Sequence, residues 1–97
     1  MAKGYWIGHV DVHNLEKYDS YRAANAAPFK TYGAKFLVRG GHQDIREGNA
    51  RSRTVILEFP SFKDAVACYE SSEYQNAKSL RLPVSECDMM IVEGYDP

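Results

Sequence analysis

The chain lacks the features that mark membrane-spanning, secreted and nucleic-acid-binding proteins. No apolar stretch among its 97 residues approaches the ~20 residues of a membrane helix, so no membrane partner is expected. The N-terminal segment has no long apolar region followed by a small-residue cleavage site, so we expect no signal peptide and a cytoplasmic location. The 12 basic and 13 acidic residues form no run of one sign and leave a net charge of −1, which argues against a nucleic-acid partner.

Cysteines and metal-binding motifs are also scarce. The two cysteines, Cys68 and Cys87, stand outside any C-x-x-C pair, so we expect reduced thiols and no disulfide framework. The three histidines, His9, His13 and His42, do not have the spacing of metal ligands. We therefore expect neither a metal site nor a cofactor.

The composition is that of one globular domain covering residues 1–97. Hydrophobic residues make up 44% of the chain and charged residues 26%, which permits a core in a domain of this size. Runs rich in aromatic and β-branched residues predict four strands. The strands are expected at residues 5–12, 35–39, 53–59 and 89–93.

Capping residues and helical spacing predict two helical segments between these strands. Asn14 can cap the first segment, and Pro28 is expected to kink it or to start a second short helix. Ser61 begins an S-x-x-D capping box at the second segment, and Ser71 or Ser72 is expected to cap a short continuation. The resulting β-α-β-β-α-β order predicts an α+β, ferredoxin-like fold, in which two helices cover one face of a four-stranded antiparallel sheet.

Strand alternation divides the sheet residues into two sets, provided that no strand contains a bulge. The set expected to face the helices is almost wholly apolar and comprises Trp6, Gly8, Val10, Val12, Phe36, Val38, Val55, Leu57, Phe59, Met90 and Val92. The opposite set also keeps a contiguous apolar group, namely Tyr5, Ile7, Leu37, Ile56, Met89 and Ile91. Such a bare patch is unusual on a monomer, so we expect a face-to-face homodimer through Ile7, Leu37, Ile56 and Ile91.

Four segments together resemble the domain-of-unknown-function 1330 family of the dimeric α+β-barrel superfamily. They are YWIGHVDV, YGAKFLVRGG, VILEFPSFKDAVACYESSEYQNAKSLR and IVEG, and the resemblance spans about residues 4–94. It implies a ferredoxin-like protomer and a homodimer of the dimeric α/β-barrel type. It supplies no catalytic residues, because the superfamily includes cofactor-less monooxygenases, lactone isomerases, haem enzymes and ligand-sensing domains.

Three polar residues of the outward-facing set, His9, Arg39 and Glu58, form the first candidate site. A histidine beside a carboxylate could act as a general base, and an arginine could hold a carboxylate or enolate oxygen. The same residues could instead form a polar network that sets the register of the dimer interface. The sequence leaves both interpretations open.

A second candidate site lies where the helices face the sheet. Tyr21, Tyr69, Tyr74 and Arg81 could line a cleft for a small molecule, or the tyrosines could be core residues at helical spacing. Cys68, beside Tyr69, is expected to be an inert packed thiol because no activating base accompanies it.

The expected function is that of a small homodimeric α/β-barrel protein that binds or converts a small organic molecule without a cofactor. The alternative is a non-catalytic ligand-binding module or a purely structural dimer. A cavity that reaches the candidate residues would favour a small-molecule site, whereas a filled interior would favour the structural role.

Overall fold

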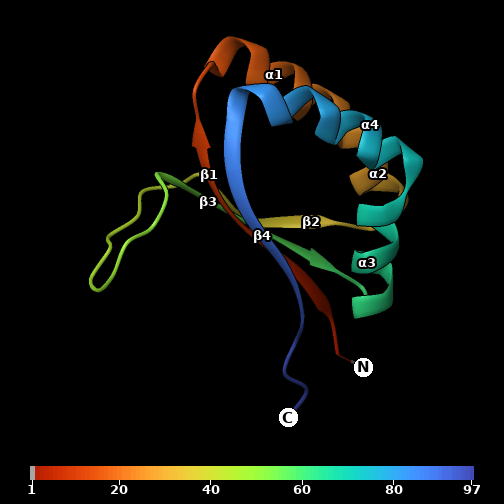
Figure 1. The fold of residues 1–97 in the computed structure, drawn as a ribbon. Helices are drawn as coiled ribbons and strands as arrows, with labels where there is room; N and C mark the ends of the chain where they lie inside the picture. The colour runs from red at the N-terminus through yellow and green to blue at the C-terminus, as the bar shows by residue number, and fades with distance from the viewer. Residues whose placement is uncertain (1) are drawn as a thin grey trace.

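The elements follow one another in the predicted β-α-β-β-α-β order, and each predicted helical segment is divided into two helices (Figure 1). The computed structural model describes residues 2–97. The strands are β1 (Gly4–Val12), β2 (Lys35–Arg39), β3 (Arg53–Phe59) and β4 (Ser85–Glu93). The helices are α1 (Leu15–Ala24), α2 (Ala26–Thr31), α3 (Phe62–Glu70) and α4 (Ser72–Arg81), and the short 3₁₀-helix η1 (Leu82–Val84) leads into β4. Within the described residues, no helix is long and apolar enough to cross a membrane.

The predicted capping residues begin the helices where expected. Asn14, Ser61 and Ser71 each accept a hydrogen bond from the backbone N–H three residues further on, at 3.0–3.1 Å. Ser71 has extended backbone angles, which end α3 before α4 begins. Pro28 lies in the first turn of α2, where its missing N–H removes no helical hydrogen bond. Local sequence signals therefore explain how both helical segments are divided.

The sheet has the strand order β2-β3-β1-β4 with antiparallel neighbours, and the helices cover one of its faces (Figure 1). The core between helices and sheet is built around Trp6, which is fully buried. Its ring lies 4.8–5.6 Å, centre to centre, from the rings of Phe29, Phe59, Tyr69 and Tyr74. Trp6 Nε1 donates a hydrogen bond to the carbonyl oxygen of Ala65 at 2.8 Å. The predicted ferredoxin-like fold is confirmed.

The predicted facing of β4 is wrong. The alternation pattern places Met90 and Val92 under the helices, but in the structure Ile91 pairs with Trp6, and Met89 lies on the same face as Ile91. Met90 and Val92 are 52% and 40% exposed on the face that the helices leave uncovered, here called the open face. All four β4 residues are apolar, so only the pairing with β1 decides which of them face the helices.

Strand β2 contains a bulge at Leu37 that reverses the facing of the residues after it. Phe36 packs on the helix-covered face, and the next residue in register is Val38, which pairs with Ile56 on the open face. The extra residue therefore moves Val38 to the open face and Arg39 to the helix-covered face, opposite to the prediction. Nothing in the strand sequence KFLVR indicates this insertion.

An apolar row crosses the open face from one edge of the sheet to the other. It consists of Val38 on β2, Ile56 on β3, Ile7 on β1 and Met90 on β4, each in register with the next. Val92 on β4 lies beside this row, opposite Tyr5 on β1. The expectation of an apolar open face is confirmed, with Met90 in the place predicted for Ile91 and Val38 in the place predicted for Leu37.

Candidate functional site

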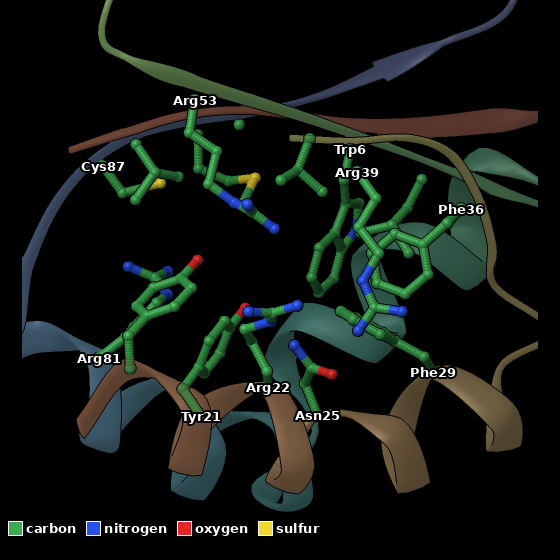
Figure 2. Close-up of a pocket in the computed structure, with 16 residues that line it drawn as sticks. Trp6, Tyr21, Arg22, Asn25, Phe29, Phe36, Arg39, Arg53, Arg81 and Cys87 are labelled. Atoms are coloured by element: carbon green, nitrogen blue, oxygen red, sulfur yellow. The ribbon is translucent and has the colours of Figure 1, made fainter. Parts of the chain in front are cut away.

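A cavity lies between the helices and the sheet (Figure 2). Its walls are mostly apolar and include Trp6, Tyr18, Phe29, Phe36, Val55 and Met89. Gly8 on β1 also lines it, and a Cβ atom added there would lie 3.1 Å from Cε of Met89. The free volume is about 30 Å³, which is room for roughly one or two water molecules.

Four arginines surround this cavity: Arg22, Arg39, Arg53 and Arg81. Figure 2 shows Arg53 reaching from the sheet towards the helices, with Arg22 facing it from α1 and with Arg81 and Arg39 on opposite sides. Arg81 is only 5% exposed, whereas Arg39 reaches solvent. Within the described residues, the lining of the cavity contains no aspartate, glutamate or histidine. The cavity is therefore positively charged.

The guanidinium of Arg81 contacts tyrosines and not a carboxylate. Its Nη2 donates a hydrogen bond to Tyr74 Oη at 3.4 Å, and its Cζ lies 5.5 Å from the centre of the Tyr21 ring. Its Nε is buried and has no hydrogen-bond partner within residues 2–97. Burial lowers the pKa of Arg81, but the neighbouring tyrosine hydroxyls outweigh this effect and the pKa is raised. Arg81 therefore stays charged.

Arg53, which is partly buried, is a second cation with an unpartnered nitrogen. Its Nε has no hydrogen-bond partner in the described part of the chain. Its guanidinium lies over Gly40, where any Cβ atom would collide with it, and Gly40 has a φ of +71° that suits glycine. Arg53 alternates in phase with the core residues Val55 and Leu57. The sequence signal for Arg53 is its place in the alternating, otherwise apolar set of Val55, Leu57 and Phe59, but Arg53 is absent from the residues predicted for the site.

Asn25 and Arg22 were also missed as candidate site residues. Asn25 is 5% exposed, and Figure 2 shows its side-chain amide directed into the cavity. It follows Tyr18 and Tyr21 at helical spacing, so its position on the buried side of α1 could be read from the sequence. Arg22 pairs with Asp19 at 3.1 Å and is part-exposed, so its sequence context gives no sign of a site.

The predicted group of Tyr21, Tyr69, Tyr74 and Arg81 comes together only in part. Tyr21 and Arg81 line the cavity. Tyr74 is fully buried behind them, with its Oη 2.9 Å from Tyr21 Oη, and burial raises its pKa far above the usual tyrosine value. Tyr69 packs against Tyr74, but its hydroxyl accepts a hydrogen bond from Lys78 at 3.2 Å. The tyrosines thus act mainly as core residues that support Arg81.

The residues His9, Arg39 and Glu58 do not share one face, so the predicted grouping is wrong. Because of the bulge in β2, Arg39 lies on the helix-covered face, with its Cζ 4.2 Å from the centre of the Phe36 ring. His9 and Glu58 do share the open face. However, His9 pairs with Thr54, which is four residues from Glu58 on β3, or about 13 Å along the strand.

His9 and Glu58 each have a partner on the open face. His9 Nδ1 lies 3.2 Å from Thr54 Oγ1. Tyr5 Oη donates a hydrogen bond to Glu58 at 3.1 Å, and Lys3 Nζ lies 3.7 Å from the same carboxylate. Both side chains are therefore satisfied without a ligand.

A second hollow, of about 340 Å³, lies on the open face beside His9. Arg51 donates hydrogen bonds to Asp11 at 2.9 Å and to Asp88 at 3.0 Å along its wall. One arginine thus faces two carboxylates, which more than balance its charge. This hollow lacks the uncompensated positive charge of the enclosed cavity.

Neither cysteine has an activated thiol. Burial, followed by the charge of Glu73, raises the pKa of Cys68 to about 12. Cys87 lines the cavity, and burial raises its pKa as well. Residues 2–97 contain no cluster of three or more His, Cys, Asp or Glu side chains that could hold a metal ion. The cavity can therefore offer positive charge and hydrogen-bond donors to a ligand.

The fold and the cavity define a ferredoxin-like α+β protein with a positively charged internal site. The chain belongs to the DUF1330 family, a domain of unknown function, whose model matches residues 3–95. No curated protein matches the sequence. The family predicted from the sequence is thus confirmed, and the match includes all residues of the cavity.

Solved structures with the same fold have low sequence identity to this chain. RPA0582, a protein of unknown function from Rhodopseudomonas palustris, is 16% identical with a TM-score of 0.76, over 99% of this chain and 85% of that one. SnoaB, a cofactor-independent oxygenase from Streptomyces nogalater, is 11% identical with a TM-score of 0.63, over 100% and 97%. A dimeric protein of unknown function with a ferredoxin-like fold from Bacteroides fragilis is 13% identical with a TM-score of 0.61, over 97% and 95%. At these identities the likeness concerns the fold alone.

Proposed function

We propose that this chain forms a homodimer and binds a small organic molecule, without a cofactor, in the cavity between its helices and its sheet. The observation that carries this proposal is Arg81, a residue that is only 5% exposed, lines the cavity and has an unpartnered Nε. Burying a charge without an opposite charge costs several kcal/mol. A purely structural core would be more stable with an apolar side chain at this position, so a ligand-binding role accounts better for the arginine.

Binding is better supported than conversion. A general base near neutral pH is usually a histidine or a carboxylate, and the described lining residues include neither. Burial raises the pKa of Tyr18 and of Cys87, so both side chains are neutral. A cofactor-free reaction remains the second candidate because SnoaB, a cofactor-independent oxygenase, has the same fold.

We assign His9 and Glu58 to the dimer interface and Arg39 to the mouth of the cavity. The contacts of His9 with Thr54 and of Glu58 with Tyr5 supply the polar part of a mainly apolar open face. Arg39 is exposed and lies over Phe36, where a ligand would enter. In this arrangement the dimer surface and the ligand site occupy opposite faces of the sheet.

Trp6 provides a direct measurement of ligand binding, because it is the single tryptophan of the chain and lines the cavity. We expect small carboxylates or phenols to change its fluorescence in a saturable way and to raise Tm. In the matched variant Gly8→Val, the added side chain should fill the cavity and abolish the response. A folded Gly8→Val protein that responds like wild type, or a wild type that responds to no compound, would contradict the proposal.

Conversion is tested with the same compounds. Wild type and Gly8→Val are incubated with each compound that binds, in air and without added cofactor, and products are sought by mass spectrometry. Product formed only by wild type would establish an enzyme. Saturable binding without product would establish a binding module.

A further inference from the structure

The cavity carries positive charge that the protein does not balance. Among the residues that the structure describes, Arg22 is the one of the four arginines that is joined to a carboxylate, that of Asp19, and Asp19 does not line the cavity. Within residues 2–97, no ion pair joins Arg39, Arg53 or Arg81 to an acidic side chain. Arginine does not lose its proton in proteins, so these charges persist at every accessible pH.

Arg53 and Arg81 act on the same end of the cavity from opposite sides. Arg53 comes from the first residue of β3 and Arg81 from the last residue of α4. Burial raises the pKa of Tyr18, which lines the cavity, and the charges of both Arg53 and Arg81 lower it. Figure 2 shows both side chains on the side of the cavity away from Phe29 and Phe36, and both carry an unpartnered Nε.

The other end of the cavity has aromatic walls, and the exposed Arg39 lies over Phe36 there. Phe29 lies edge-on to both Trp6 and Phe36, with ring centres 5.3 and 5.6 Å apart, and all three side chains line the cavity. Such walls suit a flat apolar group. The buried amide of Asn25 adds one polar group beside them.

From these observations we infer that the ligand is a small organic carboxylate with a flat apolar body, whose carboxylate is bound by Arg81 and Arg53. This inference rests on the proposed function, because it assigns a chemical class to the ligand of the same cavity. A carboxylate accepts two parallel hydrogen bonds from a guanidinium and supplies the negative charge that the cavity lacks. A neutral molecule of the same shape would leave both arginines uncompensated.

Entry requires movement of side chains at the mouth. The free volume of about 30 Å³ is smaller than an aromatic acid. Arg39 is exposed and Arg22 is part-exposed, so both long side chains can swing into solvent without breaking a buried contact. We expect the ligand to enter between β2 and α1, past these two arginines.

The experiment compares benzoate with benzamide, which has a similar size and flatness but no charge, and with sulfate, which has charge but no apolar body. Each is titrated at constant ionic strength against Trp6 fluorescence and Tm. The proteins are wild type, Arg81→Met, Arg53→Met and the matched control Arg46→Met. The Arg46 side chain is 84% exposed, is paired with Asp44 and does not line the cavity. Arg53→Met keeps the test valid if Arg81→Met does not fold.

We expect benzoate to bind wild type and Arg46→Met at least about tenfold more tightly than benzamide does, and each cavity variant to lose this preference. Benzamide binding as tightly as benzoate, or a preference that survives in both cavity variants, would overturn the inference while leaving the proposed function intact. Sulfate binding as tightly as benzoate would overturn the inference of an organic carboxylate and would favour an inorganic anion as the ligand. No response to any of the three compounds would overturn both proposals.

Discussion

Arg81 is a candidate residue from the sequence whose buried environment is visible only in the structure. It is the last residue of α4, where a basic side chain ordinarily interacts with the negative end of the helix dipole in solvent. In the structure it is buried between Tyr21 and Tyr74 and lines a cavity. The two tyrosine hydroxyls lie 2.9 Å apart and form a buried chain that ends on the guanidinium. This chain, and not a carboxylate, positions Arg81.

The hydroxyl of Tyr74 is expected to contribute more to stability than that of Tyr69. Tyr74→Phe keeps the aromatic packing but removes the acceptor of Arg81 and the partner of Tyr21, so we expect a loss of roughly 1–3 kcal/mol in the free energy of unfolding. In the control Tyr69→Phe, the freed Lys78 amine can turn to water, and the loss should stay below about 1 kcal/mol. Urea unfolding of both variants measures the difference. Equal losses would show that the buried hydroxyl of Tyr74 contributes no more to the free energy of unfolding than the hydroxyl of Tyr69.

Removal of the Arg53 charge is expected to be tolerated. Arg53→Met keeps a long unbranched side chain and removes a partly buried cation that has a buried, unpartnered Nε and no carboxylate partner, so its Tm without ligand should be no lower than that of wild type. Thermal unfolding beside Arg46→Met tests this expectation. A fall in Tm much larger than that of the control would mean that Arg53 stabilises the fold.

At the scale of elements, the segment between β2 and β3 is held to the sheet by Asp11 at the end of β1. Asp11 accepts hydrogen bonds from the backbone N–H of Ser52 and from Arg51, both at 2.9 Å. The Ser52 N–H first, and Arg51 in addition, hold the pKa of Asp11 below its usual value. The chain leading into β3, which begins with Arg53, is thereby fastened beside β1.

This contact makes the stability of the protein depend on pH. Because the folded-state pKa of Asp11 is lowered, its contribution is fully present above the unfolded-state value of about 4 and is lost as the pH falls through the lowered value. We expect Asp11→Asn to lower Tm at about pH 7 and the gap to wild type to narrow towards about pH 2. Asp44→Asn, which removes an exposed partner of Arg46, is the control and should change Tm little. A gap of constant size at both pH values would argue against Asp11 as its source.

At the scale of the whole molecule, the two faces of the sheet differ in what covers them. One face carries the helices, the core and the cavity, and the other presents the apolar row of Val38, Ile56, Ile7 and Met90. A row of this kind on a monomer is usually covered by another chain. If two sheets packed face to face, the apolar row of each protomer would be buried against the same surface of its partner.

A charge at the centre of the apolar row should disrupt the proposed dimer. Ile56 pairs with both Ile7 and Val38, so Ile56→Asp would bury an unpaired carboxylate between two protomers. We expect wild type to show twice the chain mass by light scattering after size exclusion, and Ile56→Asp to show the mass of one chain. Leu15→Asp, at an exposed position on α1, is the control and should remain dimeric. A monomeric wild type would contradict the dimer.

Local sequence patterns predicted the order of the elements, most of their boundaries and most of the core. The main boundary error is β4, which begins at Ser85 and not at the predicted residue 89. Caps such as Asn14 and Ser61 and the alternation of RTVILEF act over a few neighbouring residues, so local patterns are sufficient to predict them. The same patterns identified Tyr21 and Arg81 as facing the space between helices and sheet. They also identified an apolar open face, because alternation in β1 and β3 is unbroken.

The meeting of polar residues depends on contacts between segments far apart in the chain. The bulge at Leu37 arises from pairing with β3 and moves Arg39 from the open face to the cavity. The facing of Met89 to Val92 depends on register with β1, because every residue in that run is apolar. The cavity itself brings together Arg53 from a strand and Arg81 from a helix. Pairing and burial are properties of segments far apart in the chain, so no local pattern records them.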